Sequence, residues 1–229
     1  MSNYLGDFLL GPNDENQGIY TGNARELAKA IPDESVDLIF TDPPYLKKHL
    51  PSYDFAGKEA VRILKSDGFM LIYAGTYWKA ETMRRLGAYL DFYFDFIVQN
   101  AGNSPIMWTR KIISRHKSIL AYYKGVGLPR YNVLSWWRGG GEDKRYHTWG
   151  QDESSARYYI DCFSKPGDVV VDFFCGGGTT PYVCKMLGRH WLAFEIDSND
   201  AEQTRERVRN TQPPLFVLEP KQEEMQWID

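Results

Sequence analysis

Apolar and polar residues follow one another along the chain in blocks that predict strands alternating with helices. Short apolar runs, typical of buried parallel strands, occupy residues 36–40, 69–74, 169–172 and 190–196. Segments 92–98 and 118–123 also have strand-like composition. Apolar positions recur at helical spacing over 55–65, 78–90, 154–163 and 199–210, and another helix is expected to end near Leu187. This order predicts an α/β fold, a doubly wound and mostly parallel sheet with helices on both faces.

The chain length sets the number of domains. A chain of 229 residues, 43% of them hydrophobic, is long enough for one sizeable core and too apolar to be disordered. We therefore expect a single domain over residues 1–229. The regular pattern fades between residues 101 and 150, where glycine, proline and tryptophan are frequent. This stretch is predicted to be an inserted recognition segment.

Several classes of protein are excluded by simple features. No apolar run approaches the roughly 20 residues that span a bilayer, and the first residues lack the basic and apolar regions of a secretory signal, so we expect a cytoplasmic protein that does not bind membranes. Cys162, Cys175 and Cys184 have no metal-site spacing, which predicts reduced thiols and no metal. Because the net charge is −3, binding to a nucleic acid would require a local basic face.

A glycine-rich turn follows the strand that ends at Asp172. Gly176, Gly177 and Gly178 open the next predicted helix, an arrangement that exposes backbone N–H groups to a ligand. Glu195 ends the next predicted strand, where a carboxylate can accept hydrogen bonds from both ribose hydroxyls. The pattern indicates a nucleoside cofactor, although a tight connection and a capping residue would give the same pattern.

The position of this turn constrains the topology. Only 51 residues follow Gly178, too few to build the remainder of a sheet. The other strands must therefore come from upstream, as in a circularly permuted fold.

A second motif, Thr41-Asp42-Pro43-Pro44-Tyr45, stands where a strand ends. Open α/β sheets place their chemistry at the carboxyl ends of strands. The two prolines remove N–H donors, so the turn offers carbonyl and carboxylate oxygens that can accept hydrogen bonds from an amino group. Tyr45 adds an aromatic face on which a planar heterocycle can stack. The alternative is a rigid turn with a half-buried tyrosine.

Taken together, these motifs resemble the β class of amino DNA methyltransferases, in which the catalytic motif precedes the cofactor loop. The resemblance covers most of the chain and rests on Asp42 to Tyr45, on Phe174-x-Gly176-x-Gly178-Thr179-Thr180, and on Gly188-Arg189 leading to Glu195. It implies a Rossmann-like class I methyltransferase fold with a circularly permuted motif order. Two departures are Phe173, where the family usually has proline, and the segment 147–151, which matches the family only in part.

The resemblance also implies a cofactor, S-adenosylmethionine, and two sets of site residues. The methionine part of the cofactor would be surrounded by Phe174, Gly176, Gly178 and Thr179. Its ribose would contact Glu195, and its adenine would contact Asn23. The catalytic set is Asp42, Pro43, Pro44 and Tyr45. The full cofactor-binding set is Asn23, Asp42, Asp172, Phe174, Cys175, Gly176, Gly178, Thr179, Thr180 and Glu195.

The implied reaction is methylation of the exocyclic amine of a base flipped out of double-stranded DNA. Aspartate at position 42 favours adenine N6, whereas serine there would favour cytosine N4. The resemblance further suggests a homodimer and a restriction endonuclease partner. Alternatives that stay open are a cytosine-N4 enzyme, a methyltransferase for RNA or protein amines, a nicotinamide-dependent dehydrogenase, and an inactive DNA-binding module.

The recognition segment 101–150 carries a local excess of basic residues interleaved with aromatic ones. The basic set is Arg110, Lys111, Arg115, His116, Lys117, Arg130, Arg138, Lys144 and Arg145, and the aromatic set is Trp108, Tyr131, Trp136 and Trp137. Such a stretch can hold phosphates and read a groove. The alternative is a solvated loop with its tryptophans in the core. We expect His49, His116 and His190 to have structural or surface positions.

Overall fold

A computed structural model describes residues 4–13, 15–99, 106–138 and 153–213 of the chain. Within this part, one sheet has eight strands in the order β10-β6-β9-β5-β4-β11-β12-β3. Their bounds are β3 (Ile19–Thr21), β4 (Val36–Thr41), β5 (Leu64–Ala74), β6 (Asp91–Gln99), β9 (His116–Tyr123), β10 (Trp136–Arg138), β11 (Val169–Asp172) and β12 (His190–Glu195). Strand β9 is antiparallel to β5 and β6, and the other neighbouring pairs are parallel.

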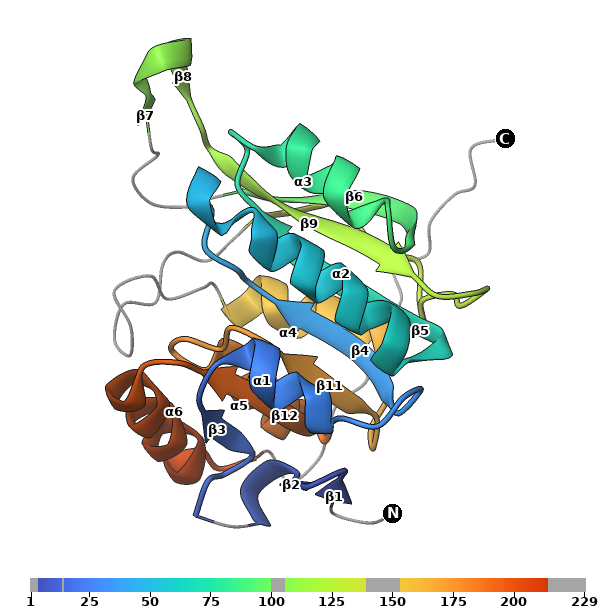
Figure 1. The fold of residues 1–229 in the computed structure, drawn as a ribbon, viewed down its shortest axis with the longest axis vertical. Helices are drawn as coiled ribbons and strands as arrows, with labels where there is room; N and C mark the ends of the chain where they lie inside the picture. Colours follow the sequence, from blue (N-terminus) through green and yellow to red (C-terminus); the bar gives the residue numbers. More distant parts are fainter. Residues whose placement is uncertain (1–3, 14, 100–105, 139–152, 214–229) are drawn as a thin grey trace.

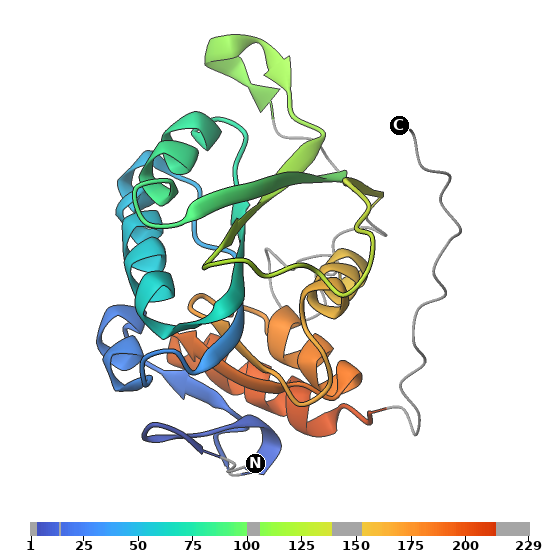
Figure 2. The same cartoon turned by 90° about the vertical axis from the view of Figure 1, so that its right-hand side faces the viewer.

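Helices cover both faces of the sheet, as Figures 1 and 2 show. One face carries α1 (Ala24–Leu27), α2 (Pro51–Ile63) and α3 (Lys79–Leu86), and the other carries α4 (Glu153–Phe163), α5 (Thr179–Leu187) and α6 (Ser198–Asn210). Short 3₁₀ turns occupy η1 (Gly11–Asn13), η2 (Ala28–Ala30), η3 (Lys47–His49) and η4 (Trp108–Arg110). The predicted doubly wound, mostly parallel α/β fold is confirmed.

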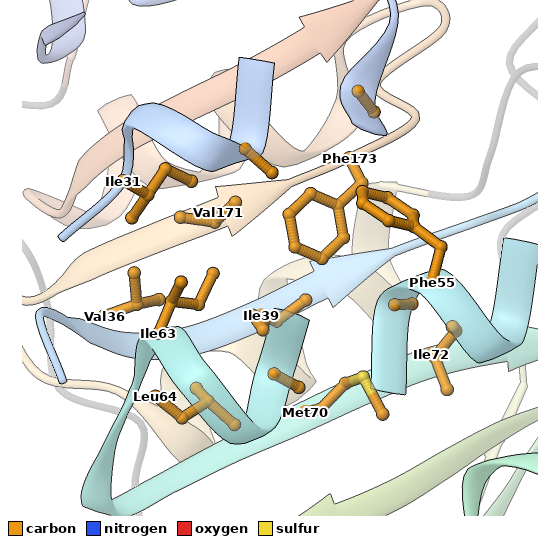
Figure 3. Close-up of a cluster of buried hydrophobic side chains, with 14 of the residues drawn as sticks. Ile31, Val36, Ile39, Phe55, Ile63, Leu64, Met70, Ile72, Val171 and Phe173 are labelled. Carbon is orange, nitrogen blue, oxygen red and sulfur yellow. The ribbon is translucent and has the colours of Figure 1, made fainter. Parts of the chain in front are cut away.

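The core consists of two apolar layers, one on each face of the sheet. Val36 and Ile39 of β4 pack with Ile63 of α2 and Val171 of β11 in the layer drawn in Figure 3. Leu38 of β4 belongs to the opposite layer. Since successive side chains of a strand point to opposite faces, a strand buried on both sides needs apolar residues at nearly every position. This is why β4 reads as a continuous apolar run in the sequence.

The order of the strands confirms the permuted topology. Strand β4 lies between β5 and β11, with Ile39 opposite Val171, although the two strands are far apart in the chain. Strand β3, near the N-terminus, pairs with β12 through Glu195 and Thr21. Because these strands are parallel, the carboxyl ends of β3, β12, β11, β4 and β5 share one edge of the sheet.

The structure corrects several predicted boundaries. Helix α2 starts at Pro51 rather than near residue 55, because a proline is well tolerated in the first turn. Helix α3 ends at Leu86 rather than near 90, and β5 begins at Leu64 rather than 69. The hairpin of β1 (Tyr4–Leu5) and β2 (Phe8–Leu9), strand β3 and helix α1 were not predicted, since each is too short to show a periodic pattern.

The described part of segment 101–150, which is predicted to be an inserted recognition segment, contributes to the main sheet as well as to its surroundings. Strands β9 and β10 belong to the central sheet, while β7 (Ile106–Met107) and β8 (Ile112–Ile113) form a separate hairpin that projects from one end of the molecule (Figures 1 and 2). Lys144, Arg145 and the segment 147–151 lie outside the described residues. Among the helices that are described, none combines the length and apolar character needed to cross a membrane.

Candidate active site

The two motifs singled out in the sequence meet at the ends of neighbouring strands. The Thr41 hydroxyl at the end of β4 donates a hydrogen bond of 2.7 Å to Oδ1 of Asp172 at the end of β11, across 131 positions of sequence. The Thr180 hydroxyl in α5 lies 3.5 Å from the carbonyl oxygen of Phe40. The Asp-Pro-Pro-Tyr turn and the glycine loop therefore stand side by side at one edge of the sheet.

Within the first motif, the side chains of Tyr45 and Asp42 interact directly. The Tyr45 hydroxyl donates a short hydrogen bond to Oδ1 of Asp42. Burial raises the pKa of the Asp42 carboxyl, while the charge of Lys117 and the hydroxyl of Tyr45 act in the opposite direction. Burial, together with the Asp42 charge, raises the pKa of the Tyr45 phenol, so Tyr45 remains a protonated donor. Pro43 is buried and Pro44 is exposed.

Lys117 of β9 belongs to this site, a position that the sequence did not reveal. Its ammonium nitrogen lies 5.5 Å from the centre of the Tyr45 ring and 5.9 Å from that of Tyr73. Both distances fall within the range of cation–π attraction. In the sequence Lys117 was one basic residue among several, because the insertion of β9 beside β5 is a tertiary pairing that local pattern does not encode.

Gly75, immediately after β5, makes room for the Tyr45 ring. A β-carbon added at Gly75 would lie 2.9 Å from Cβ and 3.0 Å from Cγ of Tyr45. Backbone and side chain would both have to move to accommodate it. The glycine therefore allows the tyrosine to lie against the chain at this point, and the sequence analysis missed it.

Asp172 is the buried link between the two motifs. Its side chain accepts hydrogen bonds from the Thr41 hydroxyl and, at 3.0 Å, from the backbone N–H of Phe174. Only 4% of the residue is exposed. Burial raises the pKa of the Asp172 carboxyl to about 6, the hydrogen bonds from Thr180 and Thr41 oppose the rise, and the nearby Asp42 charge adds to it. Asp172 thus fixes the start of the glycine loop.

Gly176 and Glu195 form the open part of the glycine loop. The backbone N–H of Gly176 donates to Oε2 of Glu195 at 2.9 Å, and Oε1 of Glu195 accepts from the N–H of Asp197 at the same distance. Gly176 adopts φ +46°, and a β-carbon built there would meet no atom within 4 Å. Space for a ligand therefore exists over Gly176, beside a carboxylate whose orientation is fixed and which retains further acceptor capacity.

Gly178, by contrast, is required by packing. It adopts φ +76°, and its β-carbon would lie 2.4 Å from Cγ2 of Thr204 in α6. The Thr204 hydroxyl in turn donates to the carbonyl oxygen of Gly176 at 2.6 Å. Helix α6 therefore holds the loop in shape, and Gly178 permits its close approach.

The remaining predicted site residues occupy varied environments. Asn23 is exposed and caps the N-terminus of α1, where its side chain accepts from the N–H of Arg25 at 3.0 Å. Phe174 is half-buried against Phe55. Cys175 is buried, and burial raises the pKa of its thiol. Thr179 and Thr180 are buried in the first turn of α5. The structure gives these residues supporting roles around the loop, and their cofactor contacts stay predictions.

Two further sequence features can be compared with the structure. Phe173, where the resembling family usually has proline, is almost completely buried and packs against Phe55 and Phe194. Phe173 therefore contributes to the core. Within the described part of the chain, no cluster of three His, Cys, Asp or Glu side chains is arranged to bind a metal ion.

Sequence comparison finds similarity to DNA methyltransferases. Residues 128–206 match the family model N6_N4_Mtase, described as DNA methylase. The Type II methyltransferase M.BamHI of Bacillus amyloliquefaciens is 29% identical over 247 residues, a match that covers 84% of this chain and 57% of that protein. These matches support an amino-DNA methyltransferase, the class that the motifs resemble. The chain spans little more than half the length of M.BamHI, and 74% of M.HpaI of Haemophilus parainfluenzae, with which it shares 25% identity.

Solved structures show the same fold for members of the amino-methyltransferase family. The cytosine-N4-specific PvuII DNA methyltransferase aligns with a TM-score of 0.73 and 19% identity, covering 85% of this chain and 86% of that one. The Thermus thermophilus protein TTHA0409, in a complex with S-adenosyl-L-methionine, aligns with a TM-score of 0.69 and 22% identity, covering 83% and 92%. These similarities confirm the Rossmann-like methyltransferase fold expected from the motifs.

Proposed function

We propose that this chain is a site-specific DNA methyltransferase that transfers a methyl group from S-adenosylmethionine to the N6 amine of a flipped-out adenine. The observation that carries the proposal is the hydrogen bond between Thr41 and Asp172, which joins the Asp-Pro-Pro-Tyr turn to the glycine loop. An amino group held by the Asp-Pro-Pro-Tyr turn can thereby lie beside a cofactor held by the glycine loop.

The residues of the loop fit the cofactor. The open space at Gly176 can take the methionine part, and the oriented Glu195 can accept hydrogen bonds from the ribose. Ile196, next to Glu195, is 72% exposed and offers an apolar surface for the adenine. When bound, S-adenosylmethionine supplies an electrophilic methyl carbon attached to a sulfonium.

The catalytic contribution of the chain is to prepare the amine. The lone pair of an aromatic amine is delocalised into the ring, which makes it a weak nucleophile. Hydrogen bonds from its two N–H groups to the Asp42 carboxylate and the Pro43 carbonyl would favour a pyramidal nitrogen and stabilise the positive charge that develops there. The hydroxyl of Tyr45 occupies one acceptor position of Asp42, and a carboxylate offers about four.

The surroundings of Asp42 keep it suitable for this role. A protonated carboxyl would be a poorer acceptor, and burial alone would favour that form. Lys117 and the Tyr45 hydroxyl both favour the ionised form instead. The Tyr45 ring can stack on the flipped base and return about 1–3 kcal/mol of the few kcal/mol that flipping costs.

The choice of adenine rests on the aspartate at position 42. Cytosine N4 is the second candidate, because the PvuII methyltransferase, specific for that atom, shares the fold. We extend the proposal to double-stranded DNA as substrate and to a homodimer. We extend it also to a companion restriction endonuclease, which the Type II names of the relatives support.

Incubation of the protein with labelled S-adenosylmethionine and unmethylated genomic DNA, followed by mass analysis of the nucleosides, tests this function. We expect N6-methyladenine, and Asp42→Ala should lower its yield about 10²- to 10³-fold. Binding of S-adenosylhomocysteine, measured by thermal shift, should change little in that variant. N4-methylcytosine would move the assignment to the second candidate. Methylation confined to RNA or protein, or stabilisation by NAD alone, would overturn the proposal.

A further inference from the structure

A hairpin with an exposed apolar tip projects beside the site. Strands β7 and β8 pair Ile106 with Ile113 and Met107 with Ile112, and η4 joins them. Figures 1 and 2 both show this hairpin extending away from the sheet and its helices. Trp108, at the turn, is 79% exposed, and Ile113 is 57% exposed. Large apolar side chains this exposed in an ordered hairpin indicate a surface that contacts another molecule.

The charge of the hairpin indicates the kind of partner. Residues 106–115 include Arg110, Lys111 and Arg115 and no acidic residue, although the whole chain has a net charge of −3. An apolar tip surrounded by cations complements a polyanion with an apolar interior, which describes duplex DNA, with phosphates outside and stacked bases inside. A second copy that docked hairpin against hairpin would instead bring like charges together.

Contacts fix η4 and Ser114, which follows β8, to the loop that adjoins Tyr45. The guanidinium of Arg110 lies 4.1 Å from the centre of the Tyr77 ring, and the Tyr77 hydroxyl is 3.1 Å from that of Thr109. The hydroxyls of Thr76 and Ser114 are 2.9 Å apart. Thr76 and Tyr77 directly follow Gly75, which packs against Tyr45. The hairpin is therefore held close to the place where a flipped base would stack.

We propose that Trp108 is a wedge that enters the DNA stack and fills the space left by the flipped base, while Lys111 and Arg115 contact phosphates. The proposal rests on the proposed function. Apolar side chains inserted between base steps are a known means of stabilising distorted DNA. An indole is large enough to stack on the neighbouring base pairs in place of the missing base.

The test compares wild type with Trp108→Ala, Trp108→Phe and a matched control, Val126→Ala. Val126 is 90% exposed and lies beyond the opposite end of β9 from the hairpin. Sequencing of DNA methylated by the wild type supplies the recognition sequence. Two duplexes containing it are then used, one fully paired and one with a mismatch opposite the target base. The methylation rate is measured on both, and the fluorescence of 2-aminopurine at the target position reports flipping.

Trp108→Ala should reduce the methylation rate of the paired duplex at least about tenfold and abolish the fluorescence rise. The methylation rate of the mismatched duplex, whose target base leaves the stack easily, should fall less than about threefold. Trp108→Phe should retain most activity, and Val126→Ala all of it. Equal losses on both duplexes, or no loss, would overturn the wedge. The wedge would also be overturned if Trp108→Ala converted a dimer into a monomer while base flipping stayed intact. Trp108 would then belong to an interface between copies of the chain. If the wild type methylates no DNA, the proposed function itself fails.

Discussion

The ammonium nitrogen of Lys117 lies over the ring of Tyr45, 5.5 Å from its centre, while the hydroxyl of the same tyrosine donates to Asp42. One aromatic residue thus connects the cation of β9 to the carboxylate of the catalytic turn. The charge of Lys117 favours the ionised form of Asp42, which burial alone would disfavour. Lys117 is therefore expected to position and tune the site without touching the reacting atoms.

Replacement of Lys117 by methionine should move the acid limb of the methylation profile to higher pH. The group that titrates is Asp42, whose pKa is already raised by burial and rises further when the cation is removed. Activity requires the ionised form, so the variant should lose more of its activity at pH 6 than at pH 8. Turnover measured between pH 5 and 9 gives the comparison.

Lys117→Arg should show the wild-type dependence of methylation on pH, because arginine keeps the positive charge that methionine removes. Lys58→Met, which removes a charge from the exposed surface of α2, is the matched control and should leave the profile unchanged. An equal loss at every pH in Lys117→Met would indicate a purely structural role for the lysine.

Gly75→Ala should damage turnover more than stability. The added methyl would lie 2.9 Å from Cβ of Tyr45 and displace its ring from the stacking position. We expect methylation to fall by about tenfold or more, since small displacements of catalytic groups are costly. Thermal shift with S-adenosylhomocysteine should show nearly normal cofactor binding. Rates within twofold of wild type would show that the ring position tolerates the change.

Alanine substitutions at Gly176 and Gly178 should differ in how far they affect stability and cofactor binding. Both positions adopt positive φ, but only at Gly178 would the methyl meet Thr204, at 2.4 Å. Gly178→Ala should lower the free energy of unfolding by about 2–4 kcal/mol, and Gly176→Ala by about 1–2 kcal/mol. Cofactor affinity per folded molecule should fall more in Gly176→Ala, whose methyl enters the ligand space.

Thr204→Ser offers an internal check on the second glycine. The nearest contact of the added methyl is Cγ2 of Thr204, and serine lacks this atom while keeping the hydroxyl that donates to Gly176. The double variant Gly178→Ala with Thr204→Ser should therefore recover part of the lost stability in urea unfolding. If the double variant is no more stable than Gly178→Ala alone, backbone strain rather than the clash accounts for the loss.

Asp172 should make stability depend on pH in a direction unusual for an aspartate. Its folded-state pKa of about 6 lies above the value of 3.8 for an exposed group. The contribution of Asp172 to the stability of the folded state is therefore largest at low pH, where the carboxyl is protonated in both states, and it is lost as the pH rises through 6. Relative to Asp172→Asn, the free energy of unfolding of the wild type should fall by about 2 kcal/mol between pH 4 and 7. Urea titrations at both pH values measure the difference, and a constant difference would contradict the raised pKa.

The sequence predicts most of the sheet because its central strands are buried on both faces. The apolar runs of β4 and β11 end in polar residues at the sheet edge, so both the strands and the positions of Asp42 and Asp172 can be read from the chain. The order of the two motifs also predicts the permuted topology. These features depend on local pattern and on the general rule that parallel strands expose their carboxyl ends together.

What the sequence could not predict depends on contacts between distant segments. Lys117 reaches the site because β9 runs antiparallel between β5 and β6. The need for glycine at position 178 comes from Thr204 on another helix, and the need at position 75 from the Tyr45 ring. Local spacing contains none of these pairings. The capping role of Asn23 was readable, since asparagine before a helix is a common cap.

The pairing of β3 with β12 has a consequence for biosynthesis. Strand β3 lies at the edge of the sheet and finds its partner in Ala193, Phe194 and Glu195, near the far end of the described chain. The chain must therefore be synthesised as far as β12 before β3 can dock in the eight-stranded sheet. Contacts between such remote segments slow folding and leave apolar surface open during translation. Premature termination before β12 should yield a fragment that chaperones retain and proteases remove.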